Sequence, residues 1–134
     1  MIIQHLLFEG HNAKFPPLSL AVVVDGLLFV SGTPGYDDKF ELSDVFAEQL
    51  GTAFVRLREV LARAGATSRD VMKTTVYLTR AQDFGEMNRL YAEFFGPAPY
   101  PARTTCIVAA LPDPKMLVEV ECIARLGGQA LRKP

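Results

Sequence analysis

The order of apolar and polar residues along the chain predicts six short β-strands. Apolar or alternating runs of strand length occupy residues 2–8, 19–24, 27–31, 71–78, 101–110 and 116–124. Asp25 and Gly26 separate the second run from the third, and a two-residue Asp-Gly link between apolar runs is a strong β-hairpin signal. We expect residues 32–35, which are rich in glycine and proline, to end that hairpin because they do not easily continue a regular strand.

A long amphipathic helix is predicted to begin at Ser43 and to end at Gly65. Its apolar residues recur at steps of three and four, the period of one helix face. They are Leu42, Phe46, Leu50, Ala53, Phe54, Leu57, Leu61 and Ala64. Gly51 lies inside this helix, where glycine costs about 1 kcal/mol relative to alanine. Close packing of the helix on the sheet is the expected reason for that glycine.

A second amphipathic helix follows the fourth strand. Its apolar stripe consists of Phe84, Met87, Tyr91 and Phe94. Asp83 is expected to cap its N-terminus, with Glu86 three residues later as the reciprocal partner. Gly96 and the prolines after it are expected to end the helix.

This order of elements predicts an α+β fold, with helices on one face of a mainly antiparallel sheet. The strands carry apolar residues at both parities, so the second face is also expected to be covered, most economically by self-association. We expect a single domain over residues 1–134 with a loose C-terminal tail at about 127–134.

Composition and charge narrow the function classes. Hydrophobic residues make up 49% of the chain, charged residues 22%, and the net charge is -1. Without a basic patch, nucleic-acid binding is not expected. No apolar run approaches the roughly 20 residues of a membrane helix, and the N-terminus does not resemble a secretory signal. Cys106 and Cys122 lack metal or redox spacing, so we expect buried thiols in a cytoplasmic protein that does not associate with membranes.

Two predicted strands near the C-terminus carry the candidate chemistry. Glu119 and Glu121 alternate with valines and therefore share one face of their strand. Arg103 and Thr105 share a face of the preceding strand, and a guanidinium there could hold a carboxylate in a two-pronged bond. Glu119 could position water or transfer a proton. From the residues alone, structural ion pairing of Arg103 and Glu119 is the more common role.

The remaining polar residues suggest less. Cys106 and Cys122 have the opposite parity to Arg103 and Glu119, so we expect both thiols to face the helices. His5 and His11 have no spaced set of ligands around them, and no metal site is expected.

Taken together, several motifs resemble the Rid (YjgF) family of RidA-like enamine/imine deaminases, in the endoribonuclease L-PSP superfamily. The motifs run in the family's order from about residue 17 to about residue 125. They are Leu28-Phe29-Val30-Ser31-Gly32, Val71-Met72-Lys73-Thr74-Thr75-Val76-Tyr77-Leu78, Met87-Asn88-x-x-Tyr91-x-x-Phe94-Phe95, Pro101-Ala102-Arg103-Thr104, Leu111-Pro112 and Val118-Glu119-Val120-Glu121.

The resemblance implies a chorismate-mutase-like fold, with a six-stranded sheet and two helices on one face, and a homotrimer with ligand clefts between subunits. It implies hydrolysis of reactive 2-imino or enamine acids to 2-keto acids and ammonia, without a metal or organic cofactor. Arg103 would hold the substrate carboxylate, and Glu119 would position water and move protons. Thr105, Gly32 and Leu18 would help to bind the substrate.

Two positions depart from the family pattern. Leu18 stands where many of these deaminases carry a tyrosine, and Thr105 stands where they often carry a cysteine. The link from Leu111-Pro112 to Glu119 is also one residue longer than usual. A deaminase of another substrate, such as an aminomuconate-like acid, is therefore an alternative. A trimer that senses small carboxylates or binds another protein, without turnover, is a second one.

Overall fold

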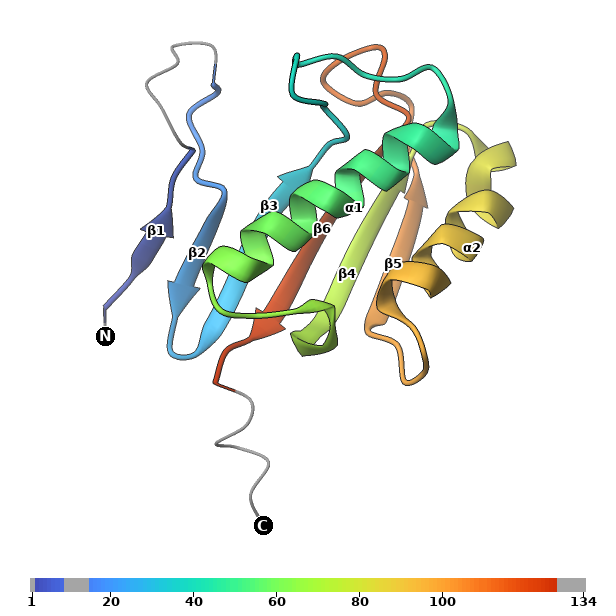
Figure 1. The fold of residues 1–134 in the computed structure, drawn as a ribbon. Helices are drawn as coiled ribbons and strands as arrows, with labels where there is room; N and C mark the ends of the chain where they lie inside the picture. Colours follow the sequence, from blue (N-terminus) through green and yellow to red (C-terminus); the bar gives the residue numbers. More distant parts are fainter. Residues whose placement is uncertain (1, 9–14, 128–134) are drawn as a thin grey trace.

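The computed structural model describes residues 2–8 and 15–127 and places two helices on one face of a six-stranded sheet (Figure 1). The strands are β1 (Gln4–Leu6), β2 (Ala21–Val24), β3 (Leu27–Thr33), β4 (Val71–Leu78), β5 (Ala102–Ile107) and β6 (Val118–Arg125). The helices are α1 (Phe46–Arg63) and α2 (Phe84–Phe95), each following a loop or a short 3-10 turn. This arrangement confirms the predicted α+β class.

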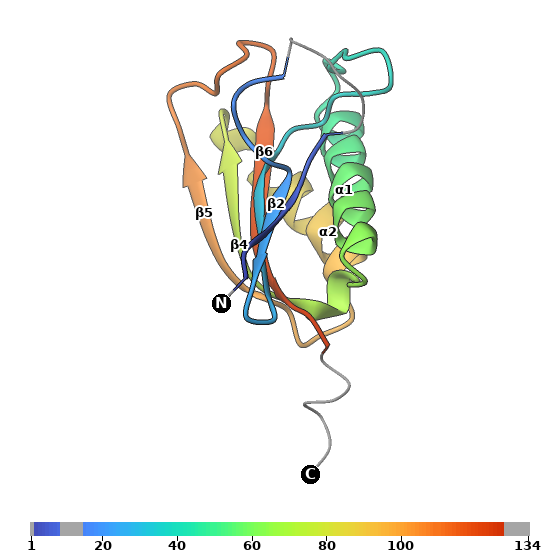
Figure 2. The ribbon, with the colours of Figure 1, turned by 90° about the vertical axis from the view of Figure 1, so that its left-hand side faces the viewer.

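The strand order across the sheet is β1-β2-β3-β6-β4-β5. Every neighbouring pair is antiparallel except β4 and β5, which are parallel and are joined through α2. The C-terminal strand β6 therefore lies at the centre of the sheet, and β5 forms one edge. Figure 2 shows both helices on the same side of the sheet, with the other side uncovered.

The predicted hairpin joins β2 to β3. Asp25 and Gly26 both have positive φ, 50° and 74°, as a two-residue hairpin turn of the primed type requires. The strand that follows is longer than predicted, because β3 continues through Gly32 to Thr33. Its pairing with β6 shifts register between Val30 and Thr33, and this irregularity lets the glycine remain within the strand.

Helix α1 begins at Phe46, three residues after the predicted start. Ser43 still serves its N-terminus: its hydroxyl oxygen accepts a hydrogen bond from the Val45 amide at 3.1 Å and donates to Glu48 at 2.7 Å. The helix ends as predicted, with Gly65 at φ 77°. The explanation expected for Gly51 is wrong, because a Cβ added there would meet nothing within 4 Å.

Helix α2 covers β4 and β5, but its predicted cap does not form. Asp83 makes no capping hydrogen bond and instead pairs with Arg80, with 2.7 Å between Oδ2 and Nε. Glu86 pairs with Arg89 at the same distance. Asp83 and Glu86 therefore each form an ion pair with an arginine three residues away and do not form the predicted reciprocal cap.

The apolar core lies between the sheet and the two helices. Alternate residues of the central strands are wholly buried there, together with one stripe of each helix. The largest wholly buried apolar side chains are Leu28, Leu50, Leu57, Leu61, Leu78, Val76, Met87, Phe95, Val118 and Val120, and Phe54 stacks on Phe94 with 4.5 Å between ring centroids. Among the described residues no helix is long and apolar enough to span a lipid bilayer.

The opposite face of the sheet carries the remaining strand residues and is covered by no described helix (Figure 2). Phe29 on β3 and Ile123 on β6 lie directly opposite each other there, and Phe29 is 40% exposed. This distribution explains why the strands are apolar at both parities: one parity fills the core, and the other leaves an apolar surface open.

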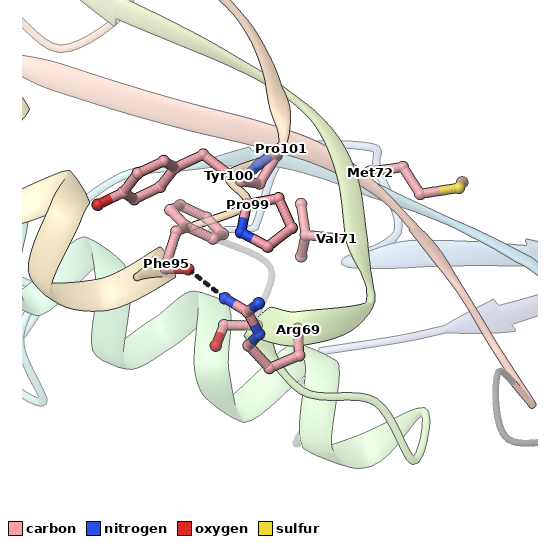
Figure 3. A pocket seen from close by; sticks show the side chains of 8 residues that line it. Arg69, Val71, Met72, Phe95, Pro99, Tyr100 and Pro101 are labelled. Carbon is pink, nitrogen blue, oxygen red and sulfur yellow. Dashed lines mark hydrogen bonds between the residues drawn. The ribbon is translucent and has the colours of Figure 1, made fainter. Parts of the chain in front are cut away.

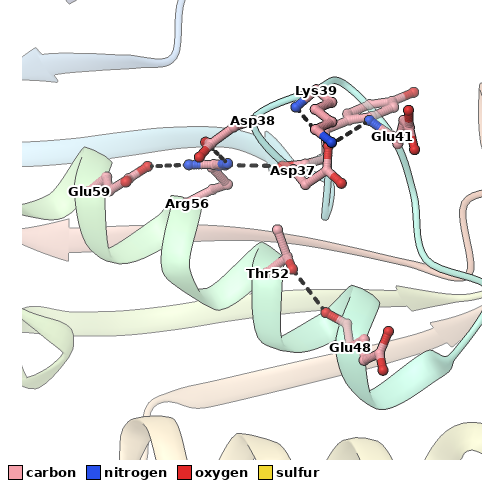
Figure 4. Close-up of polar contacts among 9 residues, drawn as sticks. Asp37, Asp38, Lys39, Glu41, Glu48, Thr52, Arg56 and Glu59 are labelled. Carbon is pink, nitrogen blue, oxygen red and sulfur yellow. Dashed lines mark hydrogen bonds and ion pairs between the residues drawn. The ribbon is translucent and has the colours of Figure 1, made fainter.

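Two polar contacts fix the loops to helix α1. The Arg56 guanidinium contacts Asp38 at 2.7 Å and Glu59 at 3.0 Å, and its Nε donates to the Tyr36 carbonyl (Figure 4). In the same loop the Asp37 carboxylate accepts hydrogen bonds from two backbone amides, which lower its pKa.

Gln49 makes the second contact and is completely buried. Its amide nitrogen donates to the carbonyls of Ser43 and Lys115 at 2.9 and 3.1 Å. Its amide oxygen accepts from the Leu117 backbone N–H at 2.6 Å. One side chain therefore ties the connection between β5 and β6 to the start of α1. The predicted loose tail, beyond Gly127, lies outside the described residues.

Candidate functional site

A cavity of about 500 Å³ opens on the uncovered face of the sheet, between the ends of β3, β4 and β6 and the segment that follows β5. Its polar lining consists of Ser31, Tyr77, Glu119 and Glu121. Its apolar lining consists of Leu18, Val108, Ala110 and Leu111, and Gly32 completes it. Three predicted site residues, Leu18, Gly32 and Glu119, are thus brought together.

Glu119 enters this cavity because its neighbours in β6 are buried. Val118 and Val120 are wholly buried on the helix side, so strand alternation turns Glu119 to the open face. Gly32 lies against it: a Cβ added at Gly32 would lie 2.8 Å from both Cδ and Oε2 of the carboxylate. A glycine at this position therefore leaves room for the glutamate side chain.

The environment of Glu119 favours its protonated form. Burial contributes most, and the charge of Glu121 two residues further along contributes next; both raise the pKa of the Glu119 carboxyl above its usual value. Within residues 2–8 and 15–127 the structure gives this carboxylate no hydrogen-bond donor. A carboxyl group with a raised pKa and open oxygens can both accept and return a proton.

Two further residues of the cavity are Glu121, which the sequence places on the face of Glu119 without a role, and Tyr77, which the sequence does not single out. The Tyr77 hydroxyl donates to Oε1 of Glu121 at 2.5 Å. This bond, followed by burial, raises the pKa of Tyr77 to about 12. The alternation of polar residues within each strand is the signal that could have pointed to these residues. That Tyr77 and Glu121 lie on the same face follows only from the pairing of β4 with β6, which sets Tyr77 opposite Glu119.

Arg103 lies on the other face of the sheet, against helix α2. Its guanidinium carbon is 4.8 Å from the centre of the Tyr91 ring and 5.9 Å from that of Phe84. One guanidinium nitrogen is 3.7 Å from the Met87 sulfur. No carboxylate in the described part of the chain pairs with this cation. Aromatic stacking therefore holds the guanidinium and leaves its charge available.

Thr105 follows Arg103 on the same side of edge strand β5. The residues paired with them in β4, Val76 and Thr74, are wholly buried on the helix face. Arg103 and Thr105 are consequently separated by the sheet from the cavity that contains Glu119.

The same pairing decides where the thiols lie. Cys122 is 3% exposed on the helix side, as predicted, and burial raises its pKa to about 12. The prediction for Cys106 is wrong: it lies opposite Tyr77 in the β4–β5 register and so faces the open side. Alternation holds within each strand, but the face that a given parity takes is set by the neighbouring strand.

A second, smaller cavity of about 170 Å³ lies near the end of α2 and contains none of the predicted site residues (Figure 3). Arg69 borders it, but its guanidinium already donates to the carbonyls of Phe95 and Pro97 at 2.8 and 2.7 Å. That arginine therefore fixes the C-terminus of α2. No group of three or more potential metal ligands occurs among the described residues.

Comparison with known proteins finds relatives that belong to one family. Residues 12–126 match the family model described as Endoribonuclease L-PSP. The chain is 39% identical over 121 residues to Reactive Intermediate Deaminase A, chloroplastic, of Arabidopsis thaliana, covering 88% of this chain and 63% of that protein. It therefore spans less than two thirds of this relative. It is 37% identical over 112 residues to a RutC family protein of Pyrococcus abyssi, covering 81% and 85% of the two chains.

Solved structures agree with the sequence matches. RidA from a Psychrobacter species superimposes with a TM-score of 0.83 at 32% identity, covering 92% of this chain and 99% of that one. The Rid family protein YyfA from Yersinia pestis gives a TM-score of 0.85 at 28% identity, covering 93% and 100%. The two helices and the six-stranded, mostly antiparallel sheet are the fold of these proteins.

Proposed function

Because this chain belongs to the Rid/YjgF family, whose model is described as Endoribonuclease L-PSP, we propose that it hydrolyses reactive 2-imino or enamine acids to 2-keto acids and ammonia. The name of its chloroplast relative, Reactive Intermediate Deaminase A, supports this class of reaction. The observation that carries the proposal is Glu119, a carboxyl group with a raised pKa and no hydrogen-bond donor among the described residues, in a cavity of about 500 Å³.

The reaction requires little more than a correctly positioned water molecule and a group that carries a proton, because the imine carbon is already electrophilic. Water forms a bond to that carbon and gives one proton to the Glu119 carboxylate, while the nitrogen takes up the electron pair of the C=N bond and a proton from the solvent. The resulting carbinolamine then loses ammonia as its hydroxyl proton passes to the solvent and the carbonyl forms. Glu119 returns its proton to the departing nitrogen, so the carboxyl group is unchanged after each turnover.

Arg103 supplies the second requirement, a grip on the substrate carboxylate. A guanidinium can donate two parallel hydrogen bonds to a carboxylate, and stacking on Tyr91 fixes its plane before the substrate arrives. Arg103 and Glu119 occupy opposite faces of one sheet, so one chain does not present both to one small molecule. We therefore propose a homotrimer in which each cleft combines the Glu119 cavity of one subunit with Arg103 of its neighbour.

Activity against an imino acid made in situ, for instance with an amino-acid oxidase, tests the reaction. The protein should accelerate keto-acid release. Arg103→Ala should lower kcat/KM by about tenfold to a hundredfold, the worth of hydrogen bonds to a charged group. Glu119→Gln should lower kcat by about a hundredfold or more. The assignment fails if no imino acid is turned over faster than in buffer, or if Arg103→Ala keeps full activity.

Mixing the two inactive variants tests the shared cleft. Arg103→Ala and Glu119→Gln subunits are unfolded together in equal amounts and refolded. In randomly mixed rings of three, about one quarter of the clefts join an intact Arg103 to an intact Glu119 of the next subunit. We expect about one quarter of the wild-type activity. If the refolded mixture is as inactive as each variant alone, Arg103 and Glu119 of the same subunit form the site, and the shared cleft is excluded.

A trimer that binds a carboxylate without turnover is the second candidate, favoured by Leu18 and Thr105, which replace the tyrosine and cysteine common in these deaminases. Calorimetry with a 2-keto acid separates the two functions. Binding that is lost in Arg103→Ala, together with no turnover of any imino acid, identifies the sensor. Binding together with turnover identifies the enzyme.

Ribonuclease activity, which the name of the family model mentions, is not part of this proposal. The net charge is -1, and Arg56, Arg80 and Arg89 are paired with carboxylates on the surface. An RNA backbone requires an accessible row of cations, and these arginines do not provide one.

A further inference from the structure

Three ionisable groups meet on the open face of the sheet, and the proposed reaction uses only one of them. Tyr77 of β4 lies directly opposite Glu119 of β6 in the antiparallel register, and Glu121 follows on the same face. All three line the cavity. The Tyr77 hydroxyl is 2.5 Å from Oε1 of Glu121, a short hydrogen bond between a phenol and a carboxylate.

The two carboxylates are not equivalent. Glu121 accepts the Tyr77 hydrogen bond, which holds its carboxylate in one place on the open face. Glu119 receives no such bond from residues 2–8 or 15–127 and lies over Gly32 instead. The charge of Glu121 contributes, after burial, to raising the pKa of Glu119.

We propose that Tyr77 and Glu121 are positioning residues: the Tyr77 hydroxyl fixes the Glu121 carboxylate beside Glu119, and the charge held there makes Glu119 the stronger base. The inference rests on the proposed function, because it says how the proton affinity of that reaction's proton carrier is set. Without Tyr77, the Glu121 side chain would be free to turn away from Glu119.

The other groups around Glu119 do not take over this task. Tyr36 lies nearby, but its hydroxyl donates to Asp113 at 2.8 Å, and burial together with this bond raises the pKa of Tyr36 to about 12. Cys106 faces Tyr77 from β5. The Lys73 ammonium, further along β4, donates to the Thr104 hydroxyl at 2.8 Å. Within one chain, the described groups next to Glu119 therefore include no cation that would cancel the charge of Glu121. The Arg103 that the proposed trimer adds to the cleft is the same in every variant compared.

The arrangement predicts the direction in which each substitution moves Glu119. Glu121→Gln removes the neighbouring negative charge and should lower the pKa of Glu119 by about one unit, a tenfold change in proton affinity. Tyr77→Phe keeps the ring but releases the Glu121 carboxylate, so that its charge is no longer held beside Glu119. Glu119 then ionises at a lower pH than in the wild type, with a smaller shift than in Glu121→Gln.

Two measurements on the full-length protein follow these shifts. Carbon NMR of protein labelled at glutamate carboxyl carbons gives the titration of Glu119, assigned through Glu119→Gln. The pH profile of kcat/KM with an in situ imino acid gives the ionisation required for activity. Both midpoints should move to lower pH in the two variants, and kcat should fall several-fold because Glu119 becomes a weaker base.

Tyr36→Phe is the matched control, since it removes a nearby tyrosine hydroxyl that is bonded to Asp113 and not to Glu121. It should leave the Glu119 midpoint unchanged. The proposal is overturned if Glu121→Gln leaves that midpoint in place or raises it, or if Tyr36→Phe moves it as far as Tyr77→Phe does. The NMR titration needs no turnover, so it tests the carboxylate pair even if the proposed reaction fails.

Discussion

Gly32 illustrates how a single residue can serve the site without any chemistry of its own. It lies in β3 directly against the Glu119 carboxylate, and its backbone is in a region open to any residue. The clash that a larger side chain would cause is with the flexible end of Glu119 and not with the backbone. Gly32 therefore acts on the position of the carboxylate and contributes little to the fold.

Gly32→Ala should inactivate the protein at small cost in stability. The added methyl group would lie 2.8 Å from Cδ of Glu119 and would push the carboxylate aside. We expect kcat/KM to fall by about a hundredfold, as for other small misplacements of catalytic groups, while the unfolding free energy changes by less than about 1 kcal/mol.

A double mutant shows whether Glu119 carries the effect of Gly32→Ala. In a Glu119→Gln background the same alanine should cost little further activity, because the carboxylate is already missing. A full hundredfold loss in that background would mean that Gly32 contacts the substrate directly.

The sequence predicted which residues share a strand face, but it did not predict how the faces of different strands align. Alternation predicts the neighbours that share a face with Glu119 and with Arg103, and within each strand this prediction is correct. Their opposite sides follow from pairing: β5 joins β4 in parallel at the sheet edge, which puts Arg103 beside the buried Thr74. Register between distant strands depends on packing that a period of two does not contain.

At the scale of elements, Gly51 is a weak point of helix α1. It lies inside the helix, and a Cβ there would meet no atom within 4 Å. Gly51→Ala should therefore raise the unfolding free energy by about 0.5 to 1 kcal/mol through reduced backbone entropy of the unfolded chain. Denaturant unfolding at fixed protein concentration measures the change.

Gly35→Ala is the contrasting variant for this test. A Cβ at Gly35 would fall on the backbone carbonyl of Gln49, which cannot move without shifting α1. It should destabilise the protein, whereas Gly51→Ala stabilises it. Equal effects of both alanines would show that space around the glycine does not decide the outcome.

Most elements were predictable because they rest on local chemistry. The β4 strand and the Asp25-Gly26 turn were predicted to the residue. The errors arose where another partner competes for the same group. Arg80, three residues before Asp83, takes the carboxylate that would have capped α2, and a register shift against β6 carries β3 past Gly32. Only the second of these partners lies far along the chain.

At the scale of the whole molecule, the uncovered sheet face is the surface on which the proposed trimer depends. Phe29 lies on this face and is 40% exposed in the single chain. Phe29→Lys should leave the fold intact but convert the trimer to monomers, because it would bury three ammonium groups per assembly. Size-exclusion chromatography with light scattering gives the mass directly, and activity should be lost with it.

Val55→Lys controls for the charge itself. Val55 lies on α1, away from the open sheet face, and at 43% is exposed slightly more than Phe29. It should leave the mass unchanged. A wild-type protein that is monomeric, or a trimer that survives Phe29→Lys, would contradict assembly through this face.

The buried Gln49 has a consequence for how this protein can change during evolution. Because Gln49 holds Lys115 and Leu117, strand β6 starts from a position fixed by helix α1 and not by the length of the preceding loop. Residues gained or lost between Pro112 and Pro114 are therefore absorbed before the anchor, and the strand keeps its register. The rim of the cavity can thus diversify by insertion and deletion while Glu119 stays in place.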